Sequence, residues 1–338
     1  MGSDLLFSLN TTMPVFLIMV IGYMLGRARI LTKEFCKTAD WVVFHLALPC
    51  MLFLDISKID LSKEFDGSYV LFCAGATIAA ILLLWLLAAA FMKDKTIIGE
   101  FVQASYRSSA AILGTTYIIN MYGDTGMAPL MIVGSVPLFN MFAVIILTFT
   151  APKAGAGEGA STSDSADAAT KPTAQTTASA SREFTKALIG IAKNPIIHGI
   201  VLGMLYHLVP FELPVIAEKT LGNLGNLTAP LALLSIGASF KGTAAIRRIR
   251  PTLLASFIKL FVLVGIFIPI AVWFGFRDSK LVALLIMLGS PTTATSYIMA
   301  KNMGHEGVVS SGSIALTTLL SSFSLTLWVF ILKSMGLI

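Results

Sequence analysis

The class of protein is decided by residues 69–92, which read YVLFCAGATIAAILLLWLLAAAFM and carry no charged side chain. A helix needs about 20 apolar residues to cross the hydrocarbon core of a bilayer, and this run has that length. The whole chain shares its character, because 56% of the 338 residues are hydrophobic and only 12% are charged, against roughly 25% charged residues in soluble domains. The composition therefore excludes a soluble globular protein. The long unbroken apolar runs also argue against the alternating pattern of a membrane β-barrel.

Apolar runs of similar length recur along the chain and predict an all-α membrane protein with ten transmembrane helices. Basic residues are distributed unevenly between the predicted loops: 15 of the 24 Lys and Arg residues fall in loops on one side and six on the other. The positive-inside rule then predicts a multi-pass protein with both termini outside the cytoplasm. The predicted spans are 8–26, 36–54, 69–92, 98–119, 127–150, 187–208, 214–238, 252–275, 280–300 and 308–332.

An internal repeat is predicted from the spacing of prolines and glycines. Residues 151–185, rich in Ala, Ser, Thr and Gly, predict a disordered cytoplasmic linker between a first unit, 1–150, and a second unit, 186–338. Each unit holds five predicted spans, so the second must enter the membrane from the opposite side. This is the inverted-repeat plan of secondary transporters. Five pairs recur at a spacing of 181 residues: Pro14 and Pro195, Gly22 and Gly203, Pro49 and Pro230, Gly123 and Gly304, and Gly126 and Gly307.

Two short polar segments occupy matching places in the two units. Residues 107–116 read RSSAAILGTT and residues 289–295 read GSPTTAT, each inside an otherwise apolar span. Proline removes a backbone donor and breaks a helix, and the amide groups at an opened helix end suit an anion such as a carboxylate. The alternative is that small residues simply permit close helix packing. The residues predicted to bind substrate are Arg107, Ser108, Ser109, Ser290, Pro291, Thr292, Thr293 and Asn226.

Two prolines predict kinks that would turn polar side chains inward. His45 precedes Pro49 by one helical turn, and Asn226 precedes Pro230 by the same spacing. Histidine changes charge near neutral pH, so His45 is a candidate for proton coupling, although a neutral His45 bonded to a carbonyl group explains it equally well. Asp40 is the second coupling candidate. The predicted positions of breaks and kinks are Pro49, Gly114, Pro230 and Pro291.

Two cations lie deep in apolar sequence, where charged residues are usually functional. Arg107 adjoins the first polar segment and would attract an anionic substrate, or else pair with Glu100 or Asp40. Lys259 has no counterpart in the first unit, where Ile78 stands at the equivalent place.

Motifs of catalysis and of metal or nucleotide binding are missing from the sequence. There is no P-loop, no G-x-S-x-G elbow, no H-E-x-x-H and no Cys/His metal spacing. We therefore expect no enzyme, no metal and no cofactor beyond a coupling H⁺ or Na⁺. The net charge of +6 reports membrane orientation, so no nucleic-acid partner is expected.

Several motifs resemble those of one transporter family. They are KNP at 193–195, LGNLTAPLALLSIGA at 224–238, PTTATSYIMA at 291–300 and ALP at 47–49. Together they resemble the auxin efflux carrier family in its short-linker prokaryotic form, which is related in fold to bile-acid symporters and sodium/proton antiporters. The resemblance implies that spans 98–119 and 280–300 are broken and cross. It also implies transport of small organic anions by a homodimer in the prokaryotic inner membrane.

The leading hypothesis is a secondary transporter that moves a carboxylate or auxin-like acid by alternating access. A membrane sensor that binds an organic anion without moving it is the alternative from another class. An ion/proton antiporter is a third hypothesis, although no pair of acidic residues lies in the middle of the predicted spans.

Overall fold

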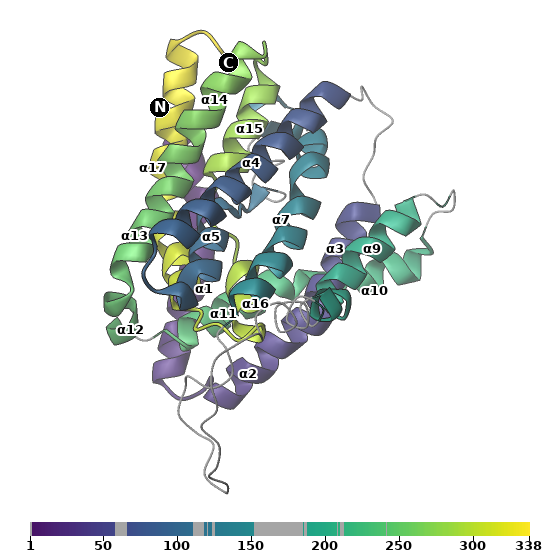
Figure 1. The fold of residues 1–338 in the computed structure, drawn as a ribbon, viewed down its shortest axis with the longest axis vertical. Coiled ribbons are helices and arrows are strands. Elements are labelled where there is room, and N and C mark those ends of the chain that lie inside the picture. Colours follow the sequence, from purple (N-terminus) through teal and green to yellow (C-terminus); the bar gives the residue numbers. More distant parts are fainter. Residues whose placement is uncertain are drawn as a thin grey trace, which may run out of the picture.

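The structure is a computed structural model of the chain. It describes residues 2–57, 66–110, 118–119, 121–123, 126–151, 185, 188–207, 209, 213–240 and 242–338, with side chains from residue 13 onward. Within this described part, all regular secondary structure is helical (Figure 1). The helices are α1 (Gly2–Arg27), α2 (Lys33–Val42), η1 (Val43–Ala47), α3 (Leu48–Ser57), α4 (Gly67–Phe91), η2 (Lys95–Ile97), α5 (Ile98–Tyr106), α7 (Ala128–Thr150), α9 (Pro195–His207), α10 (Val215–Asn226), α11 (Thr228–Ala238), α12 (Gly242–Arg247), α13 (Ile249–Phe257), η3 (Ile258–Val262), α14 (Leu263–Trp273), α15 (Ser279–Gly289), α16 (Thr295–Asn302) and α17 (Val308–Ser334).

Five helical stretches of the described chain are long and apolar enough to cross a membrane, which confirms the prediction of an all-helical membrane protein. Shorter apolar helices accompany them, among them α9 and α15. The predicted linker lies outside the described residues, apart from its ends at Ala151 and Thr185. The five long stretches are Lys33–Ser57, Gly67–Phe91, Ala128–Thr150, Ile249–Trp273 and Val308–Ser334.

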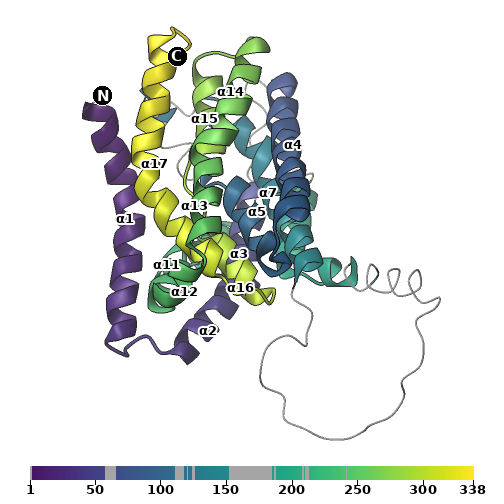
Figure 2. The same ribbon diagram turned by 60° about the vertical axis from the view of Figure 1, so that its left-hand side comes forward.

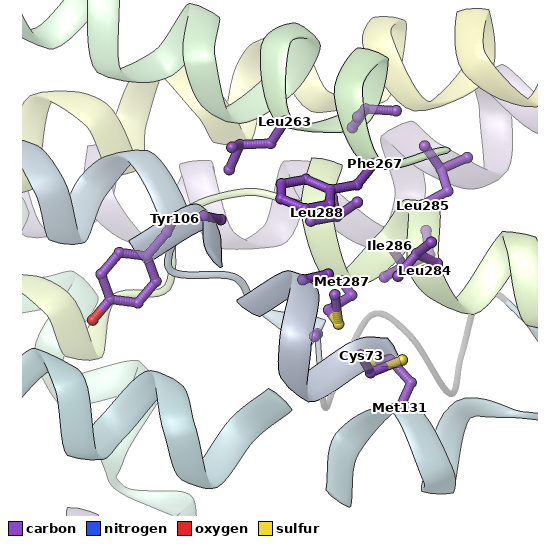
Figure 3. Close-up of a cluster of buried hydrophobic side chains, with 14 of the residues drawn as sticks. Cys73, Tyr106, Met131, Leu263, Phe267, Leu284, Leu285, Ile286, Met287 and Leu288 are labelled. Atoms are coloured by element: carbon purple, nitrogen blue, oxygen red, sulfur yellow. The ribbon is translucent and has the colours of Figure 1, made fainter. Parts of the chain in front are cut away.

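The helices pack into two groups, which are joined where α1 of the first group packs against α17 of the second. In the first group α3 packs against α9 and α10, and α1 packs against α11. In the second group α4 packs against α5 and α7, α13 packs against α17, and α14 packs against α15. The largest buried cluster of apolar side chains belongs to the second group and includes Tyr106, Phe267 and Met287 (Figure 3). Helix α15 is buried along almost its whole length in this cluster.

Two glycine contacts in the first group correspond to each other in the repeat register. A Cβ atom at Gly22 on α1 would lie 2.5 Å from the Leu234 carbonyl oxygen on α11. A Cβ atom at Gly203 on α9 would lie 3.0 Å from the Phe53 carbonyl oxygen on α3. Gly22 and Gly203 are separated by 181 residues, and so are Phe53 and Leu234. The pair α1–α11 and the pair α9–α3 therefore make the same backbone contact with the roles of the two units exchanged.

Both chain termini lie at one end of the molecule, and α2 and α12 lie at the other (Figures 1 and 2). Helix α12, which the hydropathy pattern did not predict, is a short exposed segment between α11 and α13. Helix α4 begins near the first end, where Asp66 caps it by accepting a hydrogen bond from the Tyr69 amide at 3.1 Å. The Asp66 carboxylate also pairs with the Lys280 ammonium at 2.6 Å, which joins the start of α4 to the start of α15.

The predicted kink at Pro49 coincides with a change of helix type. Residues Val43–Ala47 form one π-helical turn, in which the Leu48 amide donates to the Val43 carbonyl. His45 lies in this turn, is exposed, and its Nδ1 is 3.0 Å from the Trp41 carbonyl oxygen. The expectation that His45 points inward is wrong, because it assumed the face spacing of an uninterrupted α-helix.

The expectation for Asn226 fails for a related reason. Helix α10 ends at Asn226 and α11 begins at Thr228, so the stretch from Asn226 to Pro230 does not form one continuous helical face. The Asn226 side chain is exposed. Its predicted inward direction is therefore also wrong.

Candidate functional site

Two helices end opposite each other in the interior of the second group. Helix α5 stops at Tyr106, and Arg107 has extended backbone angles of φ −70° and ψ 133°. Helix α15 stops at Gly289, and Ser290 is also extended, with φ −72° and ψ 161°. Residues 107–109 and 290–293 are non-helical. We call these two stretches the crossing segments; Ser109 and Ser290 occupy equivalent places in the repeat register.

The crossing segments are bonded directly to each other. The Ser109 amide donates to the Pro291 carbonyl at 3.0 Å. The Ser108 and Ser290 hydroxyl oxygens lie 2.5 Å apart. The structure thus brings Ser108, Ser109, Ser290 and Pro291 together at one place, as the paired polar segments predicted.

Threonine side chains continue the same network. The Thr292 hydroxyl donates to the Ala104 carbonyl of α5 at 2.9 Å, and the Thr292 amide donates to the Thr317 hydroxyl of α17 at 3.0 Å. The Thr293 hydroxyl instead contacts the Thr295 hydroxyl at 3.2 Å, at the start of α16. Hydroxyl groups therefore satisfy two of the buried backbone groups near the helix breaks, the Ala104 carbonyl and the Thr292 amide. The predicted break position Gly114 lies outside the described residues.

Arg107 is the buried cation of the site. Only 3% of its surface is exposed. Its guanidinium donates to Gln103 Oε1 at 3.1 Å and to Asn140 Oδ1, and it touches the sulfur of Met299. Asn140 is itself held in place, because its Nδ2 donates to the Val136 carbonyl at 2.9 Å. In the described part of the chain, every hydrogen-bond partner of the guanidinium is electrically neutral.

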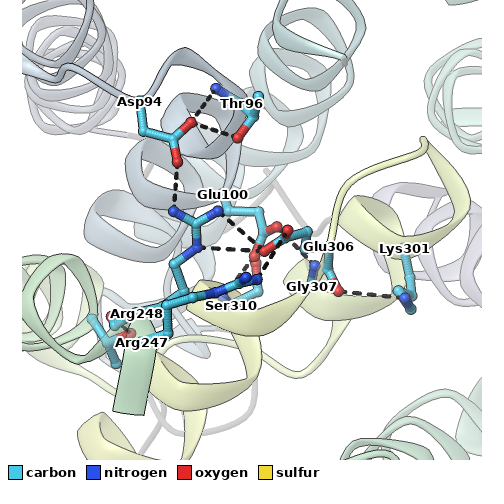
Figure 4. Close-up of polar contacts among 10 residues, drawn as sticks. Asp94, Thr96, Glu100, Arg247, Arg248, Lys301, Glu306, Gly307 and Ser310 are labelled. Carbon is cyan, nitrogen blue, oxygen red and sulfur yellow. Dashed lines mark hydrogen bonds and ion pairs between the residues drawn. The ribbon is translucent and has the colours of Figure 1, made fainter. Parts of the chain in front are cut away.

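The acidic partners expected for Arg107 are engaged elsewhere. The Glu100 carboxylate accepts hydrogen bonds from the amides of Gly307 at 2.7 Å and Ser310 at 3.1 Å, and so caps α17 (Figure 4). The Asp40 carboxylate accepts from the Ser235 hydroxyl at 2.5 Å. The alternative in which Arg107 pairs with Glu100 or Asp40 is therefore wrong.

A second donor beside Arg107 lacks an acceptor. The Nε2 group of Gln103 is buried and has no hydrogen-bond partner among the described residues. A buried donor without an acceptor costs free energy, and a buried charge without a counter-charge costs more. The Arg107 guanidinium therefore lacks a counter-charge, and the Gln103 amide N–H group beside it lacks an acceptor. An anion bound between them would supply both.

A cavity of about 1150 Å³ opens at the end of the molecule that carries α2 and α12. Asp40 lies in its wall, as do Tyr297 and Lys301 of α16. None of the described residues of the crossing segments lines it, although α16 begins directly after the second segment. Its charged lining is mostly basic and consists of Arg29, Lys33, Lys37, Arg247 and Lys301 with Asp40 and Glu306.

Ion pairs hold the loops together at the edge of this cavity (Figure 4). Arg248 pairs with Asp94 at 2.5 Å and with Glu306 at 3.3 Å, and Arg247 pairs with Glu306 at 3.4 Å. Hydrogen bonds from Thr96 and from Arg248 lower the pKa of the Asp94 carboxyl below its usual value. This network joins the loop before α5, the turn before α13 and the loop before α17.

Lys259 lies at the ends of the same broken helices. It belongs to the π-helical turn η3 and is completely buried. Its ammonium donates to the carbonyl groups of Leu288 at 2.7 Å and Tyr106 at 3.1 Å. These carbonyls are among the last of α15 and α5.

Sequence reasoning missed Gln103 and Asn140 as residues of the site. Both residues could have been identified from the sequence. Gln103 precedes Arg107 by four residues, the spacing that places two side chains on one helix face. Asn140 is a polar residue within the apolar stretch 128–150, where a buried amide needs a specific partner.

Comparisons with known proteins agree with these features. A family model described as "Membrane transport protein" matches residues 7–329. An uncharacterized transporter of Methanothermobacter thermautotrophicus is 22% identical over 331 residues, which cover 96% of this chain and 98% of the relative. An uncharacterized transporter of Methanocaldococcus jannaschii has the same identity and coverage.

Proposed function

Because the chain belongs to the membrane transport protein family of the auxin efflux carrier type, we propose that it is a secondary transporter of a small organic anion. The substrate is a carboxylate or an auxin-like acid, and it moves by alternating access around the crossing segments. One observation carries this proposal: Arg107 is buried beside the crossing segments, and its described partners are all neutral. A carboxylate would supply the missing negative charge and accept a hydrogen bond from the Gln103 Nε2 group.

Roles for the individual residues follow from their positions. Arg107 binds the carboxylate, and Ser108 and Ser290 exchange their mutual hydrogen bond for bonds to the substrate. Pro291 keeps α15 from continuing, because it has no amide hydrogen to donate. Ser109, Thr292 and Thr293 hold the crossing segments in place. Asn226 is exposed, and we assign it no role in this site.

The proposed architecture is ten transmembrane helices in two inverted repeats, residues 1–150 and 186–338. The reciprocal contacts Gly22–Leu234 and Gly203–Phe53 support it, because a pseudo-two-fold axis would exchange them. The proposed orientation places both termini outside the cytoplasm. In support, α2, α12 and the basic cavity all lie at the end opposite the termini.

The basic cavity is the proposed cytoplasmic entrance for the anion. Its positive lining raises the local concentration of negatively charged solutes. Asp40 is the better candidate for proton coupling, because it is buried and lines the cavity, whereas His45 is exposed and is not among the lining residues. As the resemblance implies, the proposal includes a homodimer in a prokaryotic inner membrane.

The experiment that tests the proposal is uptake into proteoliposomes. Radiolabelled monocarboxylates, dicarboxylates and auxin-like aromatic acids are supplied under separately imposed proton, sodium and voltage gradients. Saturable accumulation of one acid above that in empty liposomes supports the proposal and identifies the driving gradient. Binding of an acid to the protein without flux under any gradient would overturn it in favour of a sensor.

A further inference from the structure

The environment of Lys259 is unusual for a buried lysine. Its ammonium has three carbonyl oxygens around it, those of Leu288 at 2.7 Å, Tyr106 at 3.1 Å and Met287 at 3.5 Å. Every one of these partners is a backbone group, and none carries a formal charge. Lysine is almost never fully buried unless its ammonium is paired.

The ammonium is paired with the ends of two helices. Tyr106 is the last residue of α5, and Met287 and Leu288 lie in the last turn of α15. Each helix C-terminus carries the equivalent of about half a negative charge. The two helix ends that face the ammonium together carry about one negative charge. The single positive charge of Lys259 therefore neutralises the partial charges of both helix ends.

The position of Lys259 is asymmetric between the two units. The equivalent place in the first unit is Ile78, so one lysine serves the ends of both α5 and α15. The lysine lies in the π-helical turn Ile258–Val262, and such single turns often occur at functional positions. A group that touches the ends of both helices holds them at a fixed distance whenever it is present.

In other secondary transporters, unwound backbone carbonyls and half-helix C-termini coordinate the coupling Na⁺. We propose that the Lys259 ammonium is a tethered cation that occupies this carbonyl site, so that the protein needs no Na⁺ at the crossing. Removal of the side chain would then create a site for a free cation. The role of Lys259 in place of a coupling Na⁺ rests on the proposed transport function. The cation site itself can be tested without any transport assay.

The test compares two substitutions at the same position in the purified full-length protein. Lys259→Ala empties the site and leaves the three carbonyl oxygens in place. Lys259→Met removes the charge but fills the site with an apolar chain of similar length. The thermal unfolding midpoint is measured in NaCl, in choline chloride and in propylammonium chloride at equal ionic strength, because propylammonium replaces the atoms that Lys259→Ala removes.

Three results are expected together. The wild-type midpoint is the same in NaCl and choline chloride. In choline chloride, the Lys259→Ala midpoint is lower than the wild-type midpoint. It rises by about 5 °C when NaCl or propylammonium chloride is present at a concentration that nearly saturates the cation site. The Lys259→Met midpoint is low and does not respond to either cation.

Two results would overturn the proposal. One is a wild-type protein that is itself stabilised by Na⁺ relative to choline. The other is a folded Lys259→Ala protein with one midpoint in all three salts. If Lys259→Ala is recovered only unfolded, the yield of folded protein from cells grown with and without propylammonium chloride replaces the midpoint. An equal yield then counts against the proposal. Failure of the proposed transport function would appear in uptake assays and leaves these midpoints unchanged.

Discussion

The Ser109 amide donates a hydrogen bond of 3.0 Å to the Pro291 carbonyl, and this bond joins the backbones of two helices at the points where each one ends. Neither residue could make the bond from inside a continuous helix, because both groups would then pair within their own helix. The hydroxyls of Ser108 and Ser290 make a second bond beside it. The two crossing segments are therefore one bonded unit, and a change in either segment acts on both.

Replacing Pro291 with alanine should impair transport more than it impairs expression. The new residue supplies a backbone amide and removes the clash with the preceding turn, which favours continuation of α15 by up to about 3 kcal/mol. Uptake per molecule of folded protein, measured in proteoliposomes, should fall by at least about tenfold. Pro269→Ala, at a proline inside α14, is the matched control and should keep its uptake. Normal uptake by Pro291→Ala would show that the break is dispensable.

The bond between Ser108 and Ser290 should appear as energetic coupling. Ser108→Ala and Ser290→Ala each remove one hydroxyl of a buried pair and leave the other with fewer partners. In a double-mutant cycle, the loss of unfolding free energy in the double variant should be smaller than the sum of the two single losses by about 1 kcal/mol. The free energies are measured by denaturant titration in one detergent. Strictly additive losses would contradict the contact.

Asp66 should make stability depend on pH in the acid range. The hydrogen bond from Lys280 lowers the pKa of the Asp66 carboxyl well below its usual range. Asp66 therefore contributes its full share of the unfolding free energy above the ordinary aspartate pKa of about 3.9. This share is lost as the pH falls from there through the lowered pKa that Asp66 has in the folded protein. The difference in unfolding midpoint between wild type and Asp66→Asn should shrink as the pH is taken from 6 to about 3. A difference that stays constant over that range would refute the assignment.

Glycine is required where α1 meets α11 and where α9 meets α3. Gly22→Ala and Gly203→Ala would each press a methyl group against the backbone of the facing helix. Each should cost about 1 to 3 kcal/mol of unfolding free energy, with the larger loss at Gly22, where the approach is closer. Gly75→Ala is the control, because a Cβ atom there meets nothing within 4 Å. If Gly22→Ala is tolerated as well as Gly75→Ala, the close packing of α1 on α11 is wrong.

Much of the architecture follows from local sequence. The long apolar runs predict the helices, because in a bilayer every backbone group must be bonded within its own segment. Pro291 predicts a break, since the missing amide hydrogen acts locally, and the structure has non-helical backbone from Ser290 to Thr293. The spacing of 181 residues also matches Gly22 with Gly203, whose contacts prove to be reciprocal.

The parts that could not be predicted depend on changes of helix type and on distant partners. One π-helical turn at Val43–Ala47 turns His45 outward, although the proline spacing suggested the opposite. The Arg107 guanidinium contacts Gln103 on α5, Asn140 on α7 and Met299 on α16. No spacing in the sequence connects Asn140 or Met299 with Arg107. Lys259 has no counterpart in the first unit, so the repeat comparison could not assign it a place.

Uptake by Arg107→Gln tests whether Arg107 binds the transported anion. The variant keeps a polar side chain, while Arg277→Gln at an exposed arginine serves as the control. With the acid that the wild type accumulates, the initial rate at subsaturating concentration should fall about 100-fold for Arg107→Gln, as expected when one partner of a buried charge pair is removed. Arg277→Gln should transport like wild type. A folded Arg107→Gln protein that takes up the acid with the wild-type rate and KM would show that Arg107 does not bind the anion.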